Sequence, residues 1–263
     1  MTRNKQGEEV LHFAHQSVRE YLLRDNHPTL YSDVGFDSFQ ETIAHQIVAW
    51  ICLIYLLSFD TQPISSETQG IRDFPLYDYA AAYWMKHIDR CGPLNGPELP
   101  HCILLERFFD STSGNAYAHW IRVYNPETGS IRKTSAVNPH QLPSPLYCAV
   151  LFRWPDIAKK MLQRGGHSHF SSMGGKYGHP LHAASWKGDI AMVKLLLEEG
   201  ADVTTQAGVC GYALQAAANG KRVDVARLLL EKGADVNAVP DTEFGSPKTA
   251  LQEAATSYSK EEA

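Results

Sequence analysis

One short stretch of the sequence occurs twice with almost no change. LLLEEGADV spans residues 195–203, and LLLEKGADV spans residues 228–236. The two copies lie in longer segments, 179–203 and 212–236, that align without a gap at a spacing of 33 residues. A fixed period of this length predicts one small structural unit that is repeated along the chain and stacked.

The same frame continues on both sides of the two good copies. Residues 144–166 align upstream at a spacing of 35, and residues 248–263 begin the pattern again downstream at a spacing of 37 and then stop. The sequence therefore predicts a degenerate copy, two good copies and a truncated copy, at 144–178, 179–211, 212–247 and 248–263.

Each unit reads as two short helices. Pro180 suits a first helical position, where no backbone N–H is needed. Gly200 and Gly233 follow the second helices, where glycine adopts the left-handed conformation without steric cost. Asp202 and Asp235 suit the turns that come next. A single helix pair cannot bury its apolar side chains, so each copy supplies part of its neighbour's core.

The 33-residue period and the PLHAA start at residues 180–184 resemble the ankyrin repeat. The resemblance implies a helical solenoid that binds proteins through a concave face. Four positions depart from the pattern: Gln215 and Gln252 replace the first-helix histidine, Tyr147 stands there in the first copy, and Lys221 replaces the glycine between helices. The first copy also ends in a longer connecting hairpin.

The remaining part of the chain shows no repeat. We expect an amphipathic helix over residues 8–24, then a helix that starts at a capping box of Ser38 and Glu41. That helix runs into the apolar stretch 47–57, which we expect to be buried. Further helices are predicted from near Pro75, at 103–109 and at 116–124, and a Pro/Gly/Ser-containing linker is predicted at 125–143.

Three segments of this part resemble a known family. HFAHQSVREYLL (12–23), PLYDYAAAYWMKHI (75–88) and AHWIRVYNPETG (118–129), followed by ankyrin repeats, resemble fungal NACHT-type STAND signalling ATPases. The resemblance implies the end of a winged-helix segment, a helical spacer and a sensor array. The phosphate loop G-x-x-x-x-G-K-[ST] of that family is missing, because Gly175-Lys176 and Gly220-Lys221 lack its other residues. Nucleotide hydrolysis therefore does not carry over.

Composition excludes several classes of protein. The net charge of −5 and the absence of a basic stripe argue against a nucleic-acid partner. The longest apolar run, IVAWICLIYLL, has 11 residues, below the roughly 18 of a membrane helix. Five cysteines without a C-x-x-C pair, and a first segment that is not a signal peptide, predict an intracellular protein. We expect a cytoplasmic location, with a nuclear one also open.

Catalysis, metal binding and cofactor binding find no support in the sequence. His87, Cys91, His101 and Cys102 cluster loosely, but a pair four residues apart followed by an adjacent pair is poor geometry for one zinc ion. G-x-S-x-G and H-E-x-x-H are both absent. We expect a protein that is not an enzyme and needs no cofactor.

The candidate site is a protein-binding surface. Alignment with the ankyrin pattern places Trp186 and Lys187 at the end of a first helix on the concave face. Asn219 is the equivalent of Trp186 in the next copy, and Tyr177 and Tyr212 approach from the hairpins. Tryptophan is enriched at binding hot spots. Two alternatives stay open for Trp186: an anchor for a partner, or a residue that packs against hairpin 166–178.

The sequence thus predicts an all-α protein with a helical N-terminal block (1–124), a linker (125–143) and a short ankyrin solenoid (144–263). The predicted function is non-enzymatic binding of another protein. Two rival functions remain: a regulatory fragment of a larger NACHT-type ATPase, and an accessory protein of a fungal biosynthetic pathway.

Overall fold

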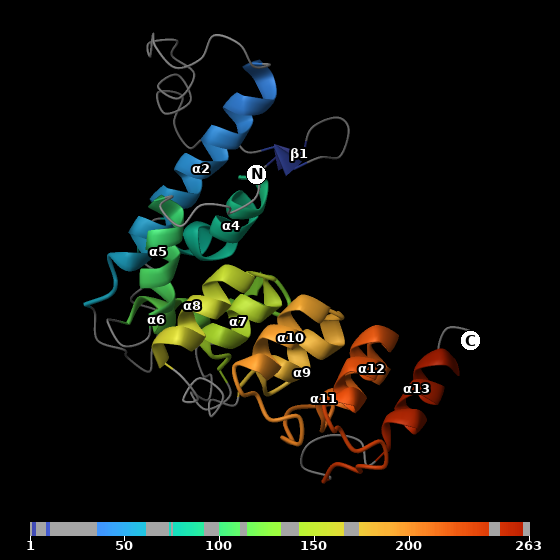
Figure 1. The fold of residues 1–263 in the computed structure, drawn as a ribbon. Helices are drawn as coiled ribbons and strands as arrows, with labels where there is room; N and C mark the ends of the chain where they lie inside the picture. The colour runs from blue at the N-terminus through green and yellow to red at the C-terminus, as the bar shows by residue number, and fades with distance from the viewer. Residues whose placement is uncertain are drawn as a thin grey trace.

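The fold is mostly helical, which confirms the predicted all-α class (Figure 1). The computed structural model describes residues 2–3, 9–10, 36–61, 74, 76–91, 100–110, 115–132, 142–165, 174–241 and 248–259. Its helices are α2 (Phe36–Leu57), α4 (Tyr77–Arg90), α5 (Pro100–Phe109), α6 (Ala116–Val123), α7 (Pro145–Leu151), α8 (Pro155–Gly165), α9 (Pro180–Lys187), α10 (Ile190–Glu198), α11 (Ala213–Asn219), α12 (Val223–Glu231) and α13 (Ala250–Ser259). Two small antiparallel pairs are β1 (Thr2–Arg3) with β2 (Glu9–Val10), and β3 (Tyr124–Asn125) with β4 (Ser130–Ile131).

The repeated half forms the predicted stack of helix pairs. In Figure 1 the pairs α7/α8, α9/α10 and α11/α12 follow one another in a row, and α13 continues it. The first helix of each pair packs on the first helix of the next, α7 on α9, α9 on α11 and α11 on α13. The second helices α8, α10 and α12 contact one another in the same order. Each pair therefore buries its apolar side chains against its neighbours.

Local geometry agrees with the roles predicted for proline, glycine and aspartate. Pro180 occupies the first turn of α9. Gly200 and Gly233 have φ of 93° and 90°, so both close their helices in the left-handed region. The Asp202 carboxylate accepts a hydrogen bond from the Thr204 amide at 2.8 Å, which forms the expected turn.

The position between the two helices of a repeat is left-handed in all three complete pairs. Arg153, Gly188 and Lys221 are equivalent in the repeat frame and have φ of 57°, 77° and 59°. A side chain in this region costs on the order of 1 kcal/mol relative to glycine. The backbone geometry of the repeat thus persists where the glycine has been lost.

The three residue types at the histidine position serve one purpose. Tyr147, His182 and Gln215 each join the first helix of their repeat to the segment that follows it. The bonds run from the Tyr177 amide to Tyr147 Oη (3.1 Å), between His182 Nε2 and the Gly211 carbonyl oxygen (3.0 Å), and from Gln215 Nε2 to the Ala238 carbonyl oxygen (2.7 Å). Each departure from histidine therefore still links helix and following segment by a hydrogen bond, although Tyr147 accepts from an amide where Gln215 donates to a carbonyl.

Two expectations for the first helices of the chain are wrong. Helix α2 begins at Phe36, so Ser38 lies inside its first turn and cannot be the N-cap of a capping box with Glu41. The helix takes in Asp37, a residue type that first turns favour. Residues 9–10 form β2 because they pair with β1, so the helix predicted over 8–24 is wrong there. The rest of that segment lies outside the described residues.

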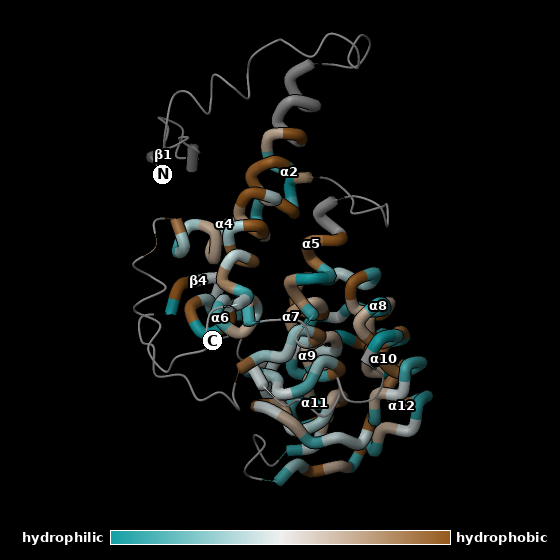
Figure 2. The backbone as a smooth tube through the Cα atoms, turned by 90° about the vertical axis from the view of Figure 1, so that its left-hand side faces the viewer, coloured by the Kyte–Doolittle hydropathy of each residue, from teal (hydrophilic) through white to brown (hydrophobic). Residues whose placement is uncertain are grey.

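The apolar stretch 47–57 forms the last part of α2, as predicted, but it is not fully buried. The hydrophobic colour covers much of α2 in Figure 2. Ile51 and Ile54 are 54% and 57% exposed. A continuous apolar run places hydrophobic side chains all around a helix, while α4 and α5 pack against only part of it. Among the described helices, none has the length and hydropathy that crossing a bilayer requires.

The other helices of the N-terminal block are confirmed as α4, α5 and α6, whereas residues 125–132 of the predicted linker include regular structure. Strands β3 and β4 form a hairpin whose second strand falls within the predicted linker 125–143. Turn-forming residues in that segment serve a hairpin, which the sequence analysis missed. The division of the chain at 125–143 remains a prediction.

Aromatic side chains join the block to the first repeat. Trp154, in the turn between α7 and α8, lies 5.8 Å from Trp84 of α4 and 6.0 Å from Phe109 of α5, measured between ring centroids. Phe152 of the same turn lies 6.5 Å from Trp120 of α6. Trp84 and Trp120 are 0% exposed. Because these rings are buried together, the block and the first repeat share one core.

A pair of ionic contacts reinforces this junction. Glu106 of α5 forms ion pairs with Lys160 and Arg164 of α8, the second at 2.8 Å. The two cations lie on one face of α8 because they are four residues apart. Glu106 is only 16% exposed, so its pairs are less screened than open surface pairs.

The β3–β4 hairpin stands at the head of the row of repeat hairpins. The Lys176 amide donates to Glu127 Oε1 at 2.5 Å, and the Tyr147 hydroxyl donates to the same oxygen at 2.5 Å. One repeat later, the Val209 amide donates to the Lys176 carbonyl oxygen at 3.0 Å. Glu127 thus gives the first repeat the lateral contact that a preceding repeat hairpin would give.

We predict that the isolated fragment 141–263 is markedly less stable than the full chain. Removal of the block exposes Trp154 and Phe152 and leaves Tyr147 without Glu127. Thermal and denaturant melts of both proteins measure the difference. Trp154→Ala in the full chain should reproduce much of the loss, about 3–5 kcal/mol. Equal melting temperatures for fragment and full chain would show that the two parts are independent.

We also predict that the stability of the protein depends on pH and that His182→Gln makes this dependence weaker. Burial lowers the pKa of His182 to about 3, against about 6.5 in the unfolded chain. Below pH 6.5 the unfolded chain therefore binds a proton that the folded chain does not. The free energy of unfolding consequently decreases as the pH is lowered. The contribution reaches on the order of 1–2 kcal/mol by pH 5.

Glutamine keeps the hydrogen bond, as Gln215 shows one repeat later, and does not titrate. Relative to the native chain, His182→Gln should gain stability steadily as the pH is lowered from 7 to 5, measured by urea melts. His87, whose pKa is also lowered by burial, keeps a residual slope in both proteins. Parallel curves for the two proteins would contradict the assignment.

Candidate functional site

Trp186 is partly buried at the C-terminal end of α9 and stacks on a tyrosine of the preceding hairpin. The rings of Trp186 and Tyr177 lie 5.0 Å apart at 28°. Helical side chains point back toward the N-terminus, so this ring extends along α9 toward the hairpin. Tyr177 is 4% exposed. The tyrosine ring therefore packs against one face of the indole and exposes little surface to solvent.

Glycine packing fixes the position of Tyr177. Gly178 has φ of 72°, and a Cβ atom there would lie 2.4 Å from the Gly208 amide nitrogen of the next hairpin. Only glycine allows this close approach of the two hairpins. Tyr177, one residue earlier, is thereby held beneath Trp186.

Lys176 completes the aromatic part of the site. Its exposed ammonium group lies 5.4 Å from the centroid of the Tyr177 ring and 5.9 Å from that of Trp186. These distances fall within the range of cation–π attraction. The indole thus has a tyrosine on one side and a positive charge close by.

Two arginines bind the carbonyl oxygens at the end of α9. Arg222 Nε donates to the Trp186 carbonyl at 3.1 Å, and Arg153 Nη2 donates to the Lys187 carbonyl at 3.2 Å. The left-handed Gly188 makes room for the Arg222 side chain, since a Cβ there would lie 2.5 Å from Arg222 Cδ. Cations at a helix C-terminus also interact favourably with its dipole.

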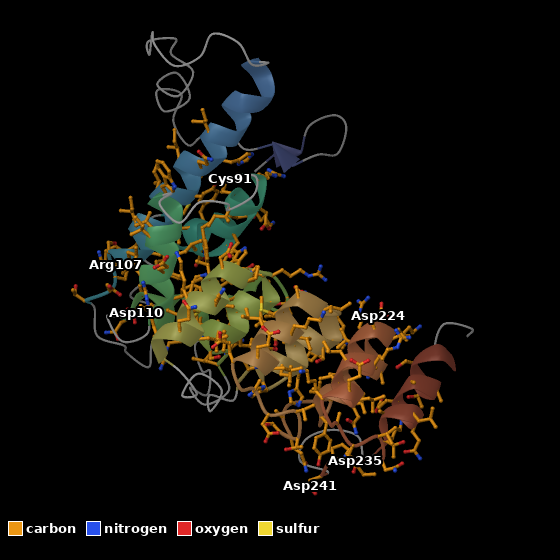
Figure 3. The ribbon with its side chains drawn as sticks, viewed as in Figure 1. Cys91, Arg107, Asp110, Asp224, Asp235 and Asp241 are labelled. Atoms are coloured by element: carbon orange, nitrogen blue, oxygen red, sulfur yellow. The ribbon has the colours of Figure 1, made fainter. Side chains whose placement is uncertain are left out.

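The structure brings some predicted site residues together and separates others. Trp186, Lys187 and Tyr177 are neighbours at the end of α9. The Asn219 side-chain amide instead donates to Glu253 of α13 at 3.3 Å, and the Tyr212 hydroxyl accepts from Gln206 at 2.6 Å. Figure 3 shows the two ends of the third repeat apart: Asp224, near the turn between helices, and Asp235 and Asp241, near the hairpins.

Both alternatives for Trp186 therefore keep a physical basis. Its stacking on Tyr177 is the hairpin packing that one alternative requires, and its partial exposure leaves area for a partner. A role in binding stays a prediction. Sequence reasoning missed Lys176, Arg153 and Arg222, although the register of the repeats places Arg153 and Arg222 at turns equivalent to that after Trp186.

His87, of the loose metal cluster, is engaged elsewhere. Its Nδ1 lies 2.7 Å from His45 Nδ1, and its Nε2 lies 3.1 Å from the Tyr79 hydroxyl. Burial lowers the pKa of His87 to about 4, so the ring is neutral near pH 7. In the part of the chain that the structure describes, no three His, Cys, Asp or Glu side chains form a possible metal site. The side chains of His101 and Cys102 lie outside it.

Comparison with known proteins supports the repeat assignment. The ankyrin repeat family model matches residues 179–207 and 212–241. The azaphilone pigments biosynthesis cluster protein L of Monascus ruber is 32% identical over 207 residues. That alignment covers 74% of the present chain and 41% of the relative, so the chain spans less than half of that protein's length. Neither comparison supports the resemblance to NACHT-type ATPases. The chain contains ankyrin repeats, as its sequence period predicts.

Proposed function

We propose that this chain is a non-enzymatic protein-interaction module that binds a partner through the surface around Trp186. The observation that carries the proposal is the partly exposed indole on an ankyrin repeat, held by Tyr177 and Lys176. Ankyrin repeats typically bind proteins and lack catalytic activity. A tryptophan whose orientation is fixed before binding loses little conformational entropy when a partner covers it.

A second proposal concerns the biological setting. The relative from Monascus ruber is named as a protein of a pigment biosynthesis cluster. This name favours the accessory role in a fungal biosynthetic pathway over the regulatory fragment of a NACHT-type ATPase. In that role the chain would hold a pathway protein and leave the chemistry to its partners. A cytoplasmic or nuclear location, and the absence of nucleic-acid and membrane partners, belong to the same proposal.

The decisive variant is Trp186→Ala. We expect it to stay folded, with a loss of stability of about 0.5–1.5 kcal/mol from the lost ring pair, and to lose its partner. Truncation of a binding anchor typically costs about 2 kcal/mol or more of binding free energy. The partner is first identified by affinity capture and mass spectrometry, and its binding to each variant is then measured by calorimetry.

Leu196→Ala and Trp186→Phe are the controls. Leu196 of α10 is 0% exposed, so its truncation should cost about 2–5 kcal/mol of stability while the folded fraction still binds. Trp186→Phe keeps an aromatic ring on Tyr177 and should retain part of the affinity. If Trp186→Ala unfolds the array as Leu196→Ala does, Trp186 is a packing residue and the proposed surface loses its anchor.

A further inference from the structure

Four cationic residues lie at or near the C-terminal half of α9 in a protein of net negative charge. Arg153, Lys187 and Arg222 lie at the C-terminal end of α9, and Lys176 lies at the hairpin side of the indole. None of the four forms an ion pair with another described residue. The chain as a whole carries a net charge of −5. The local charge is therefore positive, opposite in sign to the net charge of the molecule.

Both arginines are held by backbone hydrogen bonds, and each still has guanidinium N–H groups that can bind a partner. Each uses one N–H group for a carbonyl of residue 186 or 187, and both side chains are exposed. A guanidinium group has five N–H donors in a planar fork that matches a carboxylate. The bond to the backbone fixes the fork, so less side-chain entropy is lost when a carboxylate binds.

We infer that the surface around Trp186 binds an acidic protein segment that carries an apolar or aromatic side chain. This inference rests on the proposed function and specifies its partner. The apolar residue covers the indole, while carboxylates pair with Arg153 and Arg222 at the end of α9 and with Lys187 and Lys176 around it. Charge complementarity of this kind sets orientation and speeds association.

The surrounding charges favour a peptide over a nucleic acid. Acidic residues follow two of the cations closely in the chain, since Asp189 is two residues after Lys187 and Asp224 is two residues after Arg222. A phosphate backbone needs a longer basic track and would meet these carboxylates. A short peptide with a few carboxylates can pair with the four cations and avoid the flanking negative charges.

Selection of phage-displayed random dodecapeptides on the full-length protein tests the inference. We expect the enriched peptides to be rich in Asp and Glu, to contain an aromatic or leucine residue, and to bind less tightly when NaCl is raised from about 50 to about 300 mM. The double variant Arg153→Gln/Arg222→Gln should weaken their binding by about tenfold. Glutamine can still donate to the backbone carbonyls, so melting should stay near that of the native chain.

Three controls separate charge from structure. Arg227→Gln, at an exposed arginine of α12 that pairs with Asp224, should leave peptide binding unchanged. Arg153→Lys/Arg222→Lys keeps both charges and should bind within a few-fold of the native protein even if its helix end is loosened. If the lysine variant loses binding as fully as the glutamine variant, positive charge at these two positions does not carry the binding and the inference is overturned.

The remaining outcomes distinguish this inference from the proposed function. Enriched peptides that depend on Trp186 but are neutral, or are insensitive to the arginine variants, overturn the acidic partner and leave the binding function intact. Peptides that are indifferent to Trp186→Ala overturn both. A mixed-sequence DNA oligonucleotide and phosphatidylserine vesicles are assayed in parallel. Tighter, arginine-dependent binding to either of them than to the peptides overturns the assignment to a protein segment.

Discussion

The contact of Trp154 with Trp84 and Phe109 is the constraint on which the rest of the structure depends. Trp154 occupies the position that Asp189 takes as N-cap one repeat later, so the first repeat gives up a helix cap for a buried ring. A short array has few interfaces over which to bury apolar area. The aromatic junction supplies one more interface at the end where the array would otherwise be open.

Beyond that junction, two parallel sets of contacts connect each repeat to the next. The first helices pack on one another, and the segments that connect the repeats are linked by backbone and side-chain hydrogen bonds. Tyr147, His182 and Gln215 link the two sets, because each joins a helix to the segment after it. The surface around Trp186 lies in the middle of this series, where both neighbouring repeats support it.

The sequence predicted the repeated half well because periodicity, proline, glycine and aspartate act locally. The left-handed Gly200 and the turn of Asp202 follow from residue type alone. The N-terminal block was harder, since its helix α2 begins upstream of an apparent cap at Ser38. The β3–β4 hairpin was missed because turn-forming residues read equally well as a linker. Its role depends on Glu127 reaching Lys176, 49 residues away, and no local pattern encodes such a contact.

For the site, alignment correctly placed Trp186 and Lys187 at the end of a first helix. It could not reveal that Tyr177 is buried beneath the indole or that Asn219 turns to Glu253, because side-chain direction depends on packing between repeats. The two arginines were overlooked for a related reason. Arg153 and Arg222 belong to different repeats, and only folding brings both to the same helix end.

The β3–β4 hairpin also makes the two ends of the array differ in how readily they could accept an additional repeat. Glu127 fits only the repeat that carries Tyr147, and Trp154 fits only the block, so a gene duplication that placed a new unit between them would disrupt both contacts. A repeat duplicated after the second or third repeat would pack against helices and connecting segments like those beside the original. Adding or removing a repeat on the side of α13 therefore disturbs the packing less than a change between the block and the first repeat.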